Sequence, residues 1–176
     1  HKNLYHTFLP HSRDRYGFRK IALTLGIKAA KGEILLFTES YSRPVSDQWI
    51  KSMVGKFTED KDIVLGYSKT NRNRHMWNRI AAFDNLSFSL QYLSTTLKSN
   101  PFTGTYRNIA FRRSLFFDNK GFSQFLHLEN SEDTFINRVA TSTNTAICID
   151  KESFTETIIE RYSLWRRIKQ SFSTAR

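Results

Sequence analysis

The stretch that decides the fold reads Lys20-Ile21-Ala22-Leu23-Thr24-Leu25-Gly26-Ile27-Lys28-Ala29-Ala30-Lys31-Gly32-Glu33-Ile34-Leu35-Leu36-Phe37-Thr38. Its first part predicts a helix, because apolar residues recur at helical spacing and Gly32 is placed to end it. The run Ile34–Phe37 that follows is typical of a central parallel strand buried on both faces. A helix followed so closely by such a strand predicts an α/β sheet. The apolar helical positions are Phe18, Ile21, Ala22, Leu25 and Ala29.

The rest of the chain continues the alternation of helices and strands. Further strands are expected at residues 63–67, 108–112 and 145–149, the last of them ending the sheet. Helices are expected after Ser46 as N-cap, over residues 76–97, from Ser114 to before Gly121, and after Ser131. The residues expected on their apolar sides are Trp49, Ile50, Met53, Val54 and Phe57; then Trp77, Ile80, Ala81, Phe88, Tyr92 and Leu93; then Phe135, Ile136 and Val139.

The composition describes a chain able to fold around a core. Its 176 residues fit one domain, and 39% are apolar and 14% aromatic, which excludes a wholly disordered chain. The single cysteine, Cys148, excludes an internal disulfide and a cysteine zinc cluster, and we expect a buried thiol. No apolar run is long enough to span a membrane.

The chain is strongly basic. Its formal charge is +11 and its isoelectric point is near 10.0, so we expect a partner that carries phosphate: a nucleic acid, an anionic lipid or a nucleotide-linked substrate. The basic residues are scattered and no nucleic-acid-binding motif is visible, which argues against nucleic acid.

The C-terminal segment, residues 161–176, is basic and contains no acidic residue. Leu164, Trp165, Ile168 and Phe172 follow helical spacing along one face. Two interpretations stay open. The helix lies on an anionic membrane surface with Trp165 at the interface, or it is a solvated helix that docks on the domain.

Two acidic positions lie where α/β enzymes carry their chemistry. Glu39 follows the predicted strand Ile34–Phe37, and ligands bind outside the carboxyl ends of strands in open α/β sheets. Glu132 and Asp133 come after Ser131, where the first turn of a helix keeps carboxylates ionised, which suits a general base. A solvated turn and plain helix capping are the competing explanations. No phosphate-binding loop, dinucleotide fingerprint or hydrolase triad is present in the sequence.

Taken in order, these segments resemble the family 2 glycosyltransferases, which are inverting enzymes of the glycosyltransferase-A fold. Residues 20–38 resemble the helix and strand that lead to the family's D-x-D element. Pro44, Ser46, Asp47 and Trp49 fit the segment after it. Further matches are Gly104 with residues 108–113 to the acceptor-side G-x-G-x-N-L-A-Y-R region, residues 120–122 behind it, Glu132-Asp133 to the E-D motif, and Trp165 with Lys169 to a W-x-x-x-K pattern of membrane-associated members.

The resemblance implies a fold and its organisation. We expect an α/β, partial glycosyltransferase-A (Rossmann-like) mixed sheet flanked by helices over residues 1–160, and a basic amphipathic helix over residues 161–176. The family's nucleotide-binding strands, which precede the helix near Phe18, have no counterpart in this sequence. Members with this tail often continue into membrane helices, so the intact protein is expected at the cytoplasmic face of a membrane.

The resemblance also implies an activity. A sugar would pass from a nucleotide-diphosphate donor to a saccharide or lipid-linked acceptor hydroxyl with inversion. Asp133 would be the general base, supported by Glu132. The roles implied for other residues are donor diphosphate binding by Glu39, Tyr41, Arg166 and Lys169, acceptor binding by Gly104, Asn108 and Trp165, and ligation of a divalent cation, Mg²⁺ or Mn²⁺, by Glu39.

The chain departs from the family at the D-x-D element. Glu39-Ser40-Tyr41 stands where the family has D-A-D, and Tyr106 replaces the second glycine of G-x-G. A neutral phenol is a poor ligand for Mg²⁺ or Mn²⁺, which prefer carboxylate oxygens. Dependence on a metal therefore stays open. So does an alternative function, a non-catalytic relative that binds sugar, lipid or a protein partner.

Overall fold

The structure is a computed structural model that describes residues 5–6, 15–71, 76–123 and 132–158. In this part of the chain a four-stranded sheet has the order β1 (Ile34–Phe37), β5 (Ile109–Arg112), β3 (Ile63–Gly66), β6 (Thr145–Cys148). β5 is antiparallel to β1 and β3, whereas β3 and β6 are parallel. β1, β3 and β6 therefore share one direction, and the expected mixed α/β sheet is confirmed.

The position expected for β1 was wrong. It lies at the edge of the described sheet, not at its centre, and its described neighbour β5 is antiparallel. Leu35 is the buried residue of β1, and its other residues are partly exposed. A continuous apolar run shows that both faces of a strand are largely covered, but it carries no information about the direction of the neighbouring strand.

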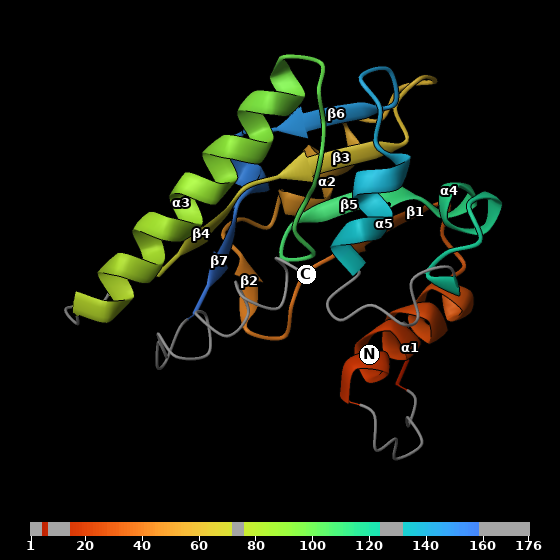
Figure 1. The fold of residues 1–176 in the computed structure, drawn as a ribbon, viewed down its shortest axis with the longest axis horizontal. Helices are drawn as coiled ribbons and strands as arrows, with labels where there is room; N and C mark the ends of the chain where they lie inside the picture. The colour runs from red at the N-terminus through yellow and green to blue at the C-terminus, as the bar shows by residue number, and fades with distance from the viewer. Residues whose placement is uncertain (1–4, 7–14, 72–75, 124–131, 159–176) are drawn as a thin grey trace.

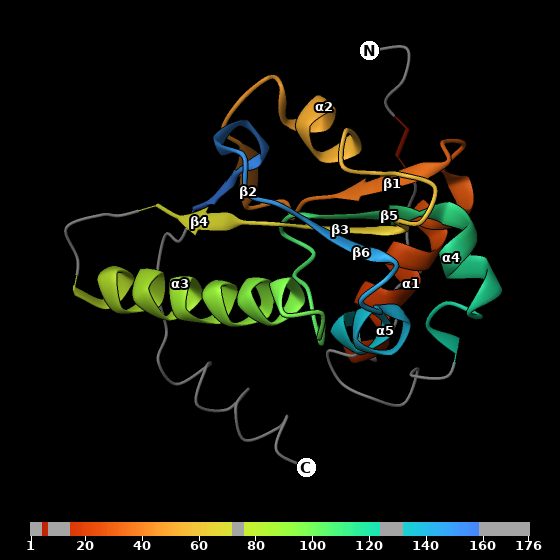
Figure 2. The ribbon, with the colours of Figure 1, turned by 90° about the horizontal axis from the view of Figure 1, so that it is seen from above.

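Helices cover both faces of this sheet (Figures 1 and 2). α1 (Arg15–Ala29), α3 (Met76–Leu97) and α5 (Glu132–Val139) lie on one face, α2 (Trp49–Val54) lies on the other, and α4 (Arg113–Asp118) follows β5 directly. Alternate strand residues feed two cores, as the two-residue period of a strand requires. Ile63, Leu65, Ile109 and Phe111 pack with Ile27, Tyr92, Phe135 and Ile136, while Val64 and Ala110 pack with Trp49, Met53 and Cys148.

The apolar sides expected for three helices were partly wrong. In α1, Phe18, Ile21 and Leu25 are 37–40% exposed, whereas Lys20 and Ile27 are buried. Ile50 of α2 and Ile80 and Phe88 of α3 are also exposed. Asn78, Asn85 and Ser89 take the buried side of α3, together with Ala81 and Tyr92.

The reason in α3 is hydrogen bonding to strand backbone. Asn85 Nδ2 donates to the Ser68 carbonyl at 2.7 Å, and the Tyr92 hydroxyl donates to the Gly66 carbonyl at 2.7 Å. A buried carbonyl needs a partner, so polar residues on this side stabilise the contact better than an all-apolar face. At α2 the helix begins two residues after the expected position, with Gln48 as N-cap, and Ser46 Oγ accepts the Gln48 N–H at 3.1 Å.

A second sheet was not expected from the sequence. It has the order β2 (Ser42–Pro44), β7 (Thr155–Thr157), β4 (Ser68–Thr70), and β7 pairs antiparallel with β2 and parallel with β4. The 3₁₀ turn Lys151–Ser153 leads into β7. Glu156 on β7 accepts hydrogen bonds from Arg43 Nε and Nη2 at 3.2 and 2.8 Å, and Lys69 Nζ lies 3.4 Å away. This carboxylate ties the three strands together.

Glu156→Gln is expected to lower stability at neutral pH by up to about 1 kcal/mol. The hydrogen bonds from Arg43 hold the pKa of Glu156 below its ordinary value. A lowered pKa means that the stabilisation is present above the ordinary glutamate pKa of about 4.3 and is lost as the pH falls through the lowered value. Denaturant unfolding at pH 7 and at pH 3 measures the change, with the exposed Glu152→Gln as control. A deficit of equal size at both pH values would contradict this account.

No helix in the described ranges is both long enough and apolar enough to cross a membrane. The expected C-terminal helix, residues 161–176, lies outside the described residues.

Candidate functional site

The candidate site lies at one edge of the four-stranded sheet. β1, β3 and β6 end at this edge, and β5 begins there because it runs in the opposite direction. Phe37, the last residue of β1, pairs with Ile109, the first residue of β5. The residues after β1 and before β5 therefore meet at the carboxyl edge, where open α/β sheets bind ligands.

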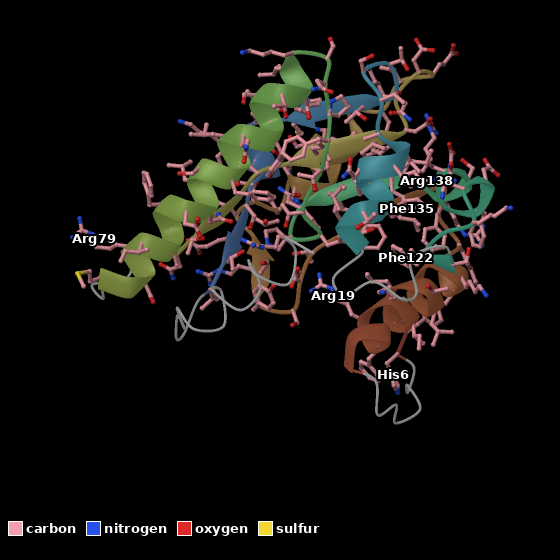
Figure 3. All side chains as sticks on the ribbon, in the orientation of Figure 1. His6, Arg19, Arg79, Phe122, Phe135 and Arg138 are labelled. Atoms are coloured by element: carbon pink, nitrogen blue, oxygen red, sulfur yellow. The ribbon has the colours of Figure 1, made fainter. Side chains whose placement is uncertain are left out.

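The segment that replaces the D-x-D element forms a turn at this edge. The Ser42 N–H donates to the Glu39 carbonyl at 2.9 Å, which closes the turn over Ser40 and Tyr41. Arg19 Nη2, from α1, donates to Glu39 Oε1 at 2.7 Å. The Glu39 side chain is 13% exposed and that of Arg19 is 45% exposed. Figure 3 shows Arg19 between α1 and the sheet. The Glu39 carboxylate thus has a protein cation as its partner.

Tyr41 is the second member of the site. Burial raises its pKa to about 12, and its hydrogen bond to Glu39 acts in the same direction, while the charges of Arg107 and Arg19 act against them. The phenol is therefore neutral at physiological pH and donates its proton to the carboxylate. The side chain is still 46% exposed, so a ligand can reach it.

Arg107 supplies a second positive charge. It directly precedes Asn108 at the start of β5, and its guanidinium donates to Asn85 Oδ1 of α3. Its backbone carbonyl accepts a hydrogen bond from Thr155 Oγ1 at 3.1 Å. Contacts from α3 and β7 therefore hold Arg107 beside Tyr41, whose pKa its charge influences. Arg19, Glu39, Tyr41 and Arg107 are called the edge cluster below.

Asn108 and Gly104, expected to bind the acceptor, are both buried. The Asn108 amide accepts from Trp49 Nε1 at 3.0 Å and donates to the carbonyls of Tyr67 and Ser153 at 2.8 and 2.7 Å. A Cβ at Gly104 would lie 2.7 Å from Leu65 Cδ2. Packing accounts for both residues in this structure, and a role in acceptor binding stays a prediction.

The substitution at Tyr106 also has a packing explanation. Its ring is 3% exposed and meets Phe37 edge-on, with ring centroids 5.3 Å apart. The aromatic side chain that replaces the family's second glycine has become part of the core beneath the candidate site.

The expected general base lies at the start of a helix. α5 begins at Glu132 and Asp133, and five residues separate its end at Val139 from β6 at Thr145. This short connection makes α5 run back along the sheet, so its first turn lies toward the carboxyl edge, as Figure 1 shows. The roles of Asp133 and Glu132 stay predictions. Ser131, Trp165, Arg166 and Lys169 lie outside the described residues.

The edge cluster does not fit a divalent cation. Across the described residues, no group of three histidine, cysteine, aspartate or glutamate side chains is placed to bind a metal ion. Glu39, the expected ligand, is bound by Arg19, and Tyr41 offers a protonated phenol. Hard cations such as Mg²⁺ and Mn²⁺ prefer ionised or carbonyl oxygens, and neither side chain offers one without a competing proton or cation.

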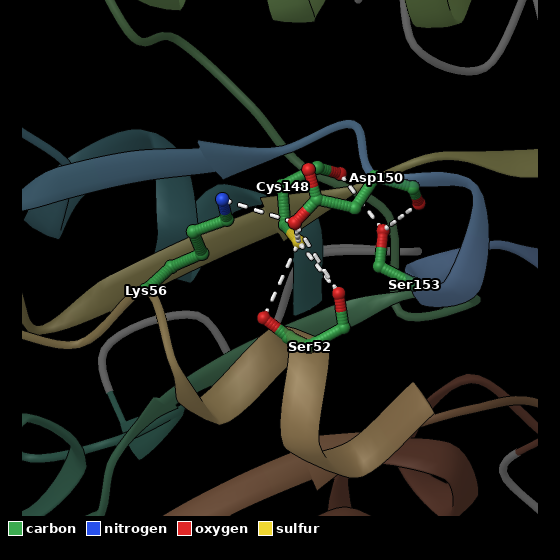
Figure 4. A network of polar contacts seen from close by, with 5 residues as sticks. All are labelled: Ser52, Lys56, Cys148, Asp150 and Ser153. Carbon is green, nitrogen blue, oxygen red and sulfur yellow. Dashed lines mark hydrogen bonds and ion pairs between the residues drawn. The ribbon is translucent and has the colours of Figure 1, made fainter. Parts of the chain in front are cut away.

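A second polar network serves the fold (Figure 4). Asp150 receives Lys56 Nζ at 3.0 Å and Ser52 Oγ at 3.3 Å, and Lys56 holds the pKa of Asp150 below its ordinary value. Cys148 is completely buried, as expected, and its thiol donates to the Ser52 carbonyl at 3.5 Å. These contacts fasten α2 to the end of β6.

Sequence reasoning missed Arg19, Arg107 and Asn85. Arg107 is adjacent to Asn108 in the matched motif, and this was the available signal. The Arg19–Glu39 pair joins residues twenty positions apart, and no local pattern marks it.

Comparisons with known proteins give one weak likeness. No family model and no curated protein matches the chain. Among solved structures, mannosyl-3-phosphoglycerate synthase from Rubrobacter xylanophilus is similar with a TM-score of 0.45 and 11% sequence identity, over 88% of this chain and 47% of that one. The chain thus spans about half the length of that enzyme. A likeness of this strength assigns no function.

Proposed function

We propose that this protein is a glycosyltransferase that transfers a sugar from a nucleotide-diphosphate donor to an acceptor hydroxyl with inversion. The observation that carries the proposal is the edge cluster: two arginines, a carboxylate and a phenol gather at the carboxyl edge of the sheet. The sequence resemblance places the donor diphosphate after β1, which is where this cluster lies.

The proposed chemistry assigns each group a task. Asp133 takes the proton of the acceptor hydroxyl as its oxygen bonds to the anomeric carbon, and the nucleoside diphosphate leaves from the opposite face of the sugar. Proton transfer to a positioned carboxylate accelerates such a step by about 10²–10⁴-fold. The leaving diphosphate gains negative charge, and cationic side chains that already point at it stabilise that charge. Arg19 and Arg107 are the described residues suited to this task.

Tyr41 favours a second candidate, the non-catalytic relative that binds sugar, lipid or a protein partner. A lost carboxylate at this position is what a degenerate donor site would contain.

Nucleotide binding to the intact protein tests the proposal. UDP or GDP at 100 times its dissociation constant is expected to stabilise the folded state by about 2.7 kcal/mol, which raises the melting temperature by about 5–10 °C. Uridine and guanosine, which lack the diphosphate, are the matched controls and should give little shift. If neither nucleotide shifts the melting temperature, with or without Mn²⁺, the transferase proposal fails and the non-catalytic candidate gains support.

A further inference from the structure

We propose that this protein binds the diphosphate of its donor without a divalent cation, and that the Arg19–Glu39 ion pair stands where a metal-binding carboxylate would otherwise be. The inference rests on the proposed function and concerns the same site. It makes Arg19 the main diphosphate-binding residue, Arg107 the second positive charge, and Glu39 a positioning residue for Arg19.

The first argument is the occupation of Glu39. Its carboxylate is largely enclosed and accepts hydrogen bonds from the Arg19 guanidinium and the Tyr41 phenol. A divalent cation that bound here would have to displace both hydrogen-bond donors and would then lie beside the positive charge of Arg19. Coulomb repulsion at such short distances costs several kcal/mol at the effective dielectric of a protein surface. The fold therefore disfavours a metal at this carboxylate.

The second argument is the suitability of the two arginines for a diphosphate. A guanidinium presents a rigid fork of N–H donors that matches phosphate oxygens, and it stays charged at all physiological pH values. Arg19 is nearly half exposed, so an anion from solvent can reach it. Its contact with Glu39 fixes its orientation, and less conformational entropy is then lost when an anion binds.

The third argument is the charge of the edge cluster. Arg107 is held by Asn85 and acts on the same phenol as Arg19. With Glu39 ionised and Tyr41 neutral, the four side chains carry one net positive charge. A phosphate dianion or diphosphate is attracted to such a cluster directly, and a metal ion is not needed to reverse the sign of the site. This is the service that a bridging cation supplies in a carboxylate-rich site.

The test is the binding of inorganic pyrophosphate, UDP and GDP to the intact protein by calorimetry, in EDTA and in Mn²⁺. For the unmodified protein we expect the dissociation constants in the two conditions to agree within about twofold. Arg19→Ala should weaken binding of all three ligands by about tenfold or more, as expected for loss of one charge-assisted phosphate contact. Arg79→Ala is the charge-matched control, because Arg79 is exposed on α3 far from Arg19 (Figure 3), and it should leave binding unchanged.

A gain-of-function variant makes the test sharper. Arg19→Ala combined with Tyr41→Asp frees Glu39 and supplies a second carboxylate, so this double variant should bind UDP more tightly in Mn²⁺ than in EDTA. Binding by the unmodified protein that tightens tenfold or more in Mn²⁺ would overturn the inference, and so would unchanged pyrophosphate binding by a folded Arg19→Ala. The comparison of EDTA with Mn²⁺ needs no variant, so it decides even if Arg19→Ala fails to fold. Absence of binding in every condition is a different result, which refutes the proposed function itself.

Discussion

Asp133→Asn in the intact protein is expected to lower the rate of sugar transfer by about 10²–10⁴-fold while donor binding stays within about twofold. The amide has nearly the shape of the carboxylate but cannot accept the acceptor proton. The substitution therefore removes the base without removing volume. Steady-state kinetics, which separate kcat from KM, together with calorimetric binding of UDP and GDP, measure the two halves of this prediction.

Asp118→Asn is the matched control for Asp133→Asn. Asp118 is an exposed residue at the end of α4, which follows the other end of β5 and so lies away from the carboxyl edge. This control should retain normal turnover. Turnover retained by Asp133→Asn, or lost through weakened donor binding alone, would remove Asp133 from the role of base.

Asn108→Ala is expected to destabilise the fold by about 3 kcal/mol. The amide is completely buried and bonds three segments: Trp49 at the start of α2, Tyr67 after β3 and Ser153 before β7. Truncation leaves a buried N–H and two buried carbonyls without these partners, and each costs its desolvation penalty. Denaturant unfolding of the variant measures the loss.

The same unfolding experiment on Asn137→Ala provides the comparison. Asn137 is exposed on α5, so its replacement should change stability by less than about 0.5 kcal/mol, with helix propensity favouring alanine. If Asn108→Ala also costs less than about 1 kcal/mol, the amide does not hold these segments together, and a ligand-binding explanation for Asn108 would become the better one.

Much of the fold follows from the sequence because its strands are short apolar runs. Residues 34–37, 63–66, 109–112 and 145–148 were all expected as strands, and the long helix has the expected bounds, Met76–Leu97. The second sheet escaped prediction for a physical reason. Its strands are three residues long, are rich in polar residues, and are stabilised by pairing with distant segments, so no local period marks them.

The buried faces of the helices were harder to predict than the helices themselves. In α3 the choice of face depends on the carbonyls of Gly66 and Ser68, which need partners from Tyr92 and Asn85. Hydrophobic spacing cannot detect that requirement. The same holds at the site: Glu39 and Tyr41 stand in a recognisable motif, but the meaning of the tyrosine depends on Arg19 and Arg107, which only the tertiary fold brings beside it.

The measurement that tests the central claim most directly is release of nucleoside diphosphate by the intact protein from a panel of UDP- and GDP-sugars, with EDTA present and with candidate saccharide and lipid-linked acceptors. The account predicts acceptor-dependent release from at least one donor without added metal, and loss of that release in Asp133→Asn. Binding of the nucleotides without release from any donor, in EDTA or in Mn²⁺, would contradict it and would identify the protein as a binding relative of the transferases.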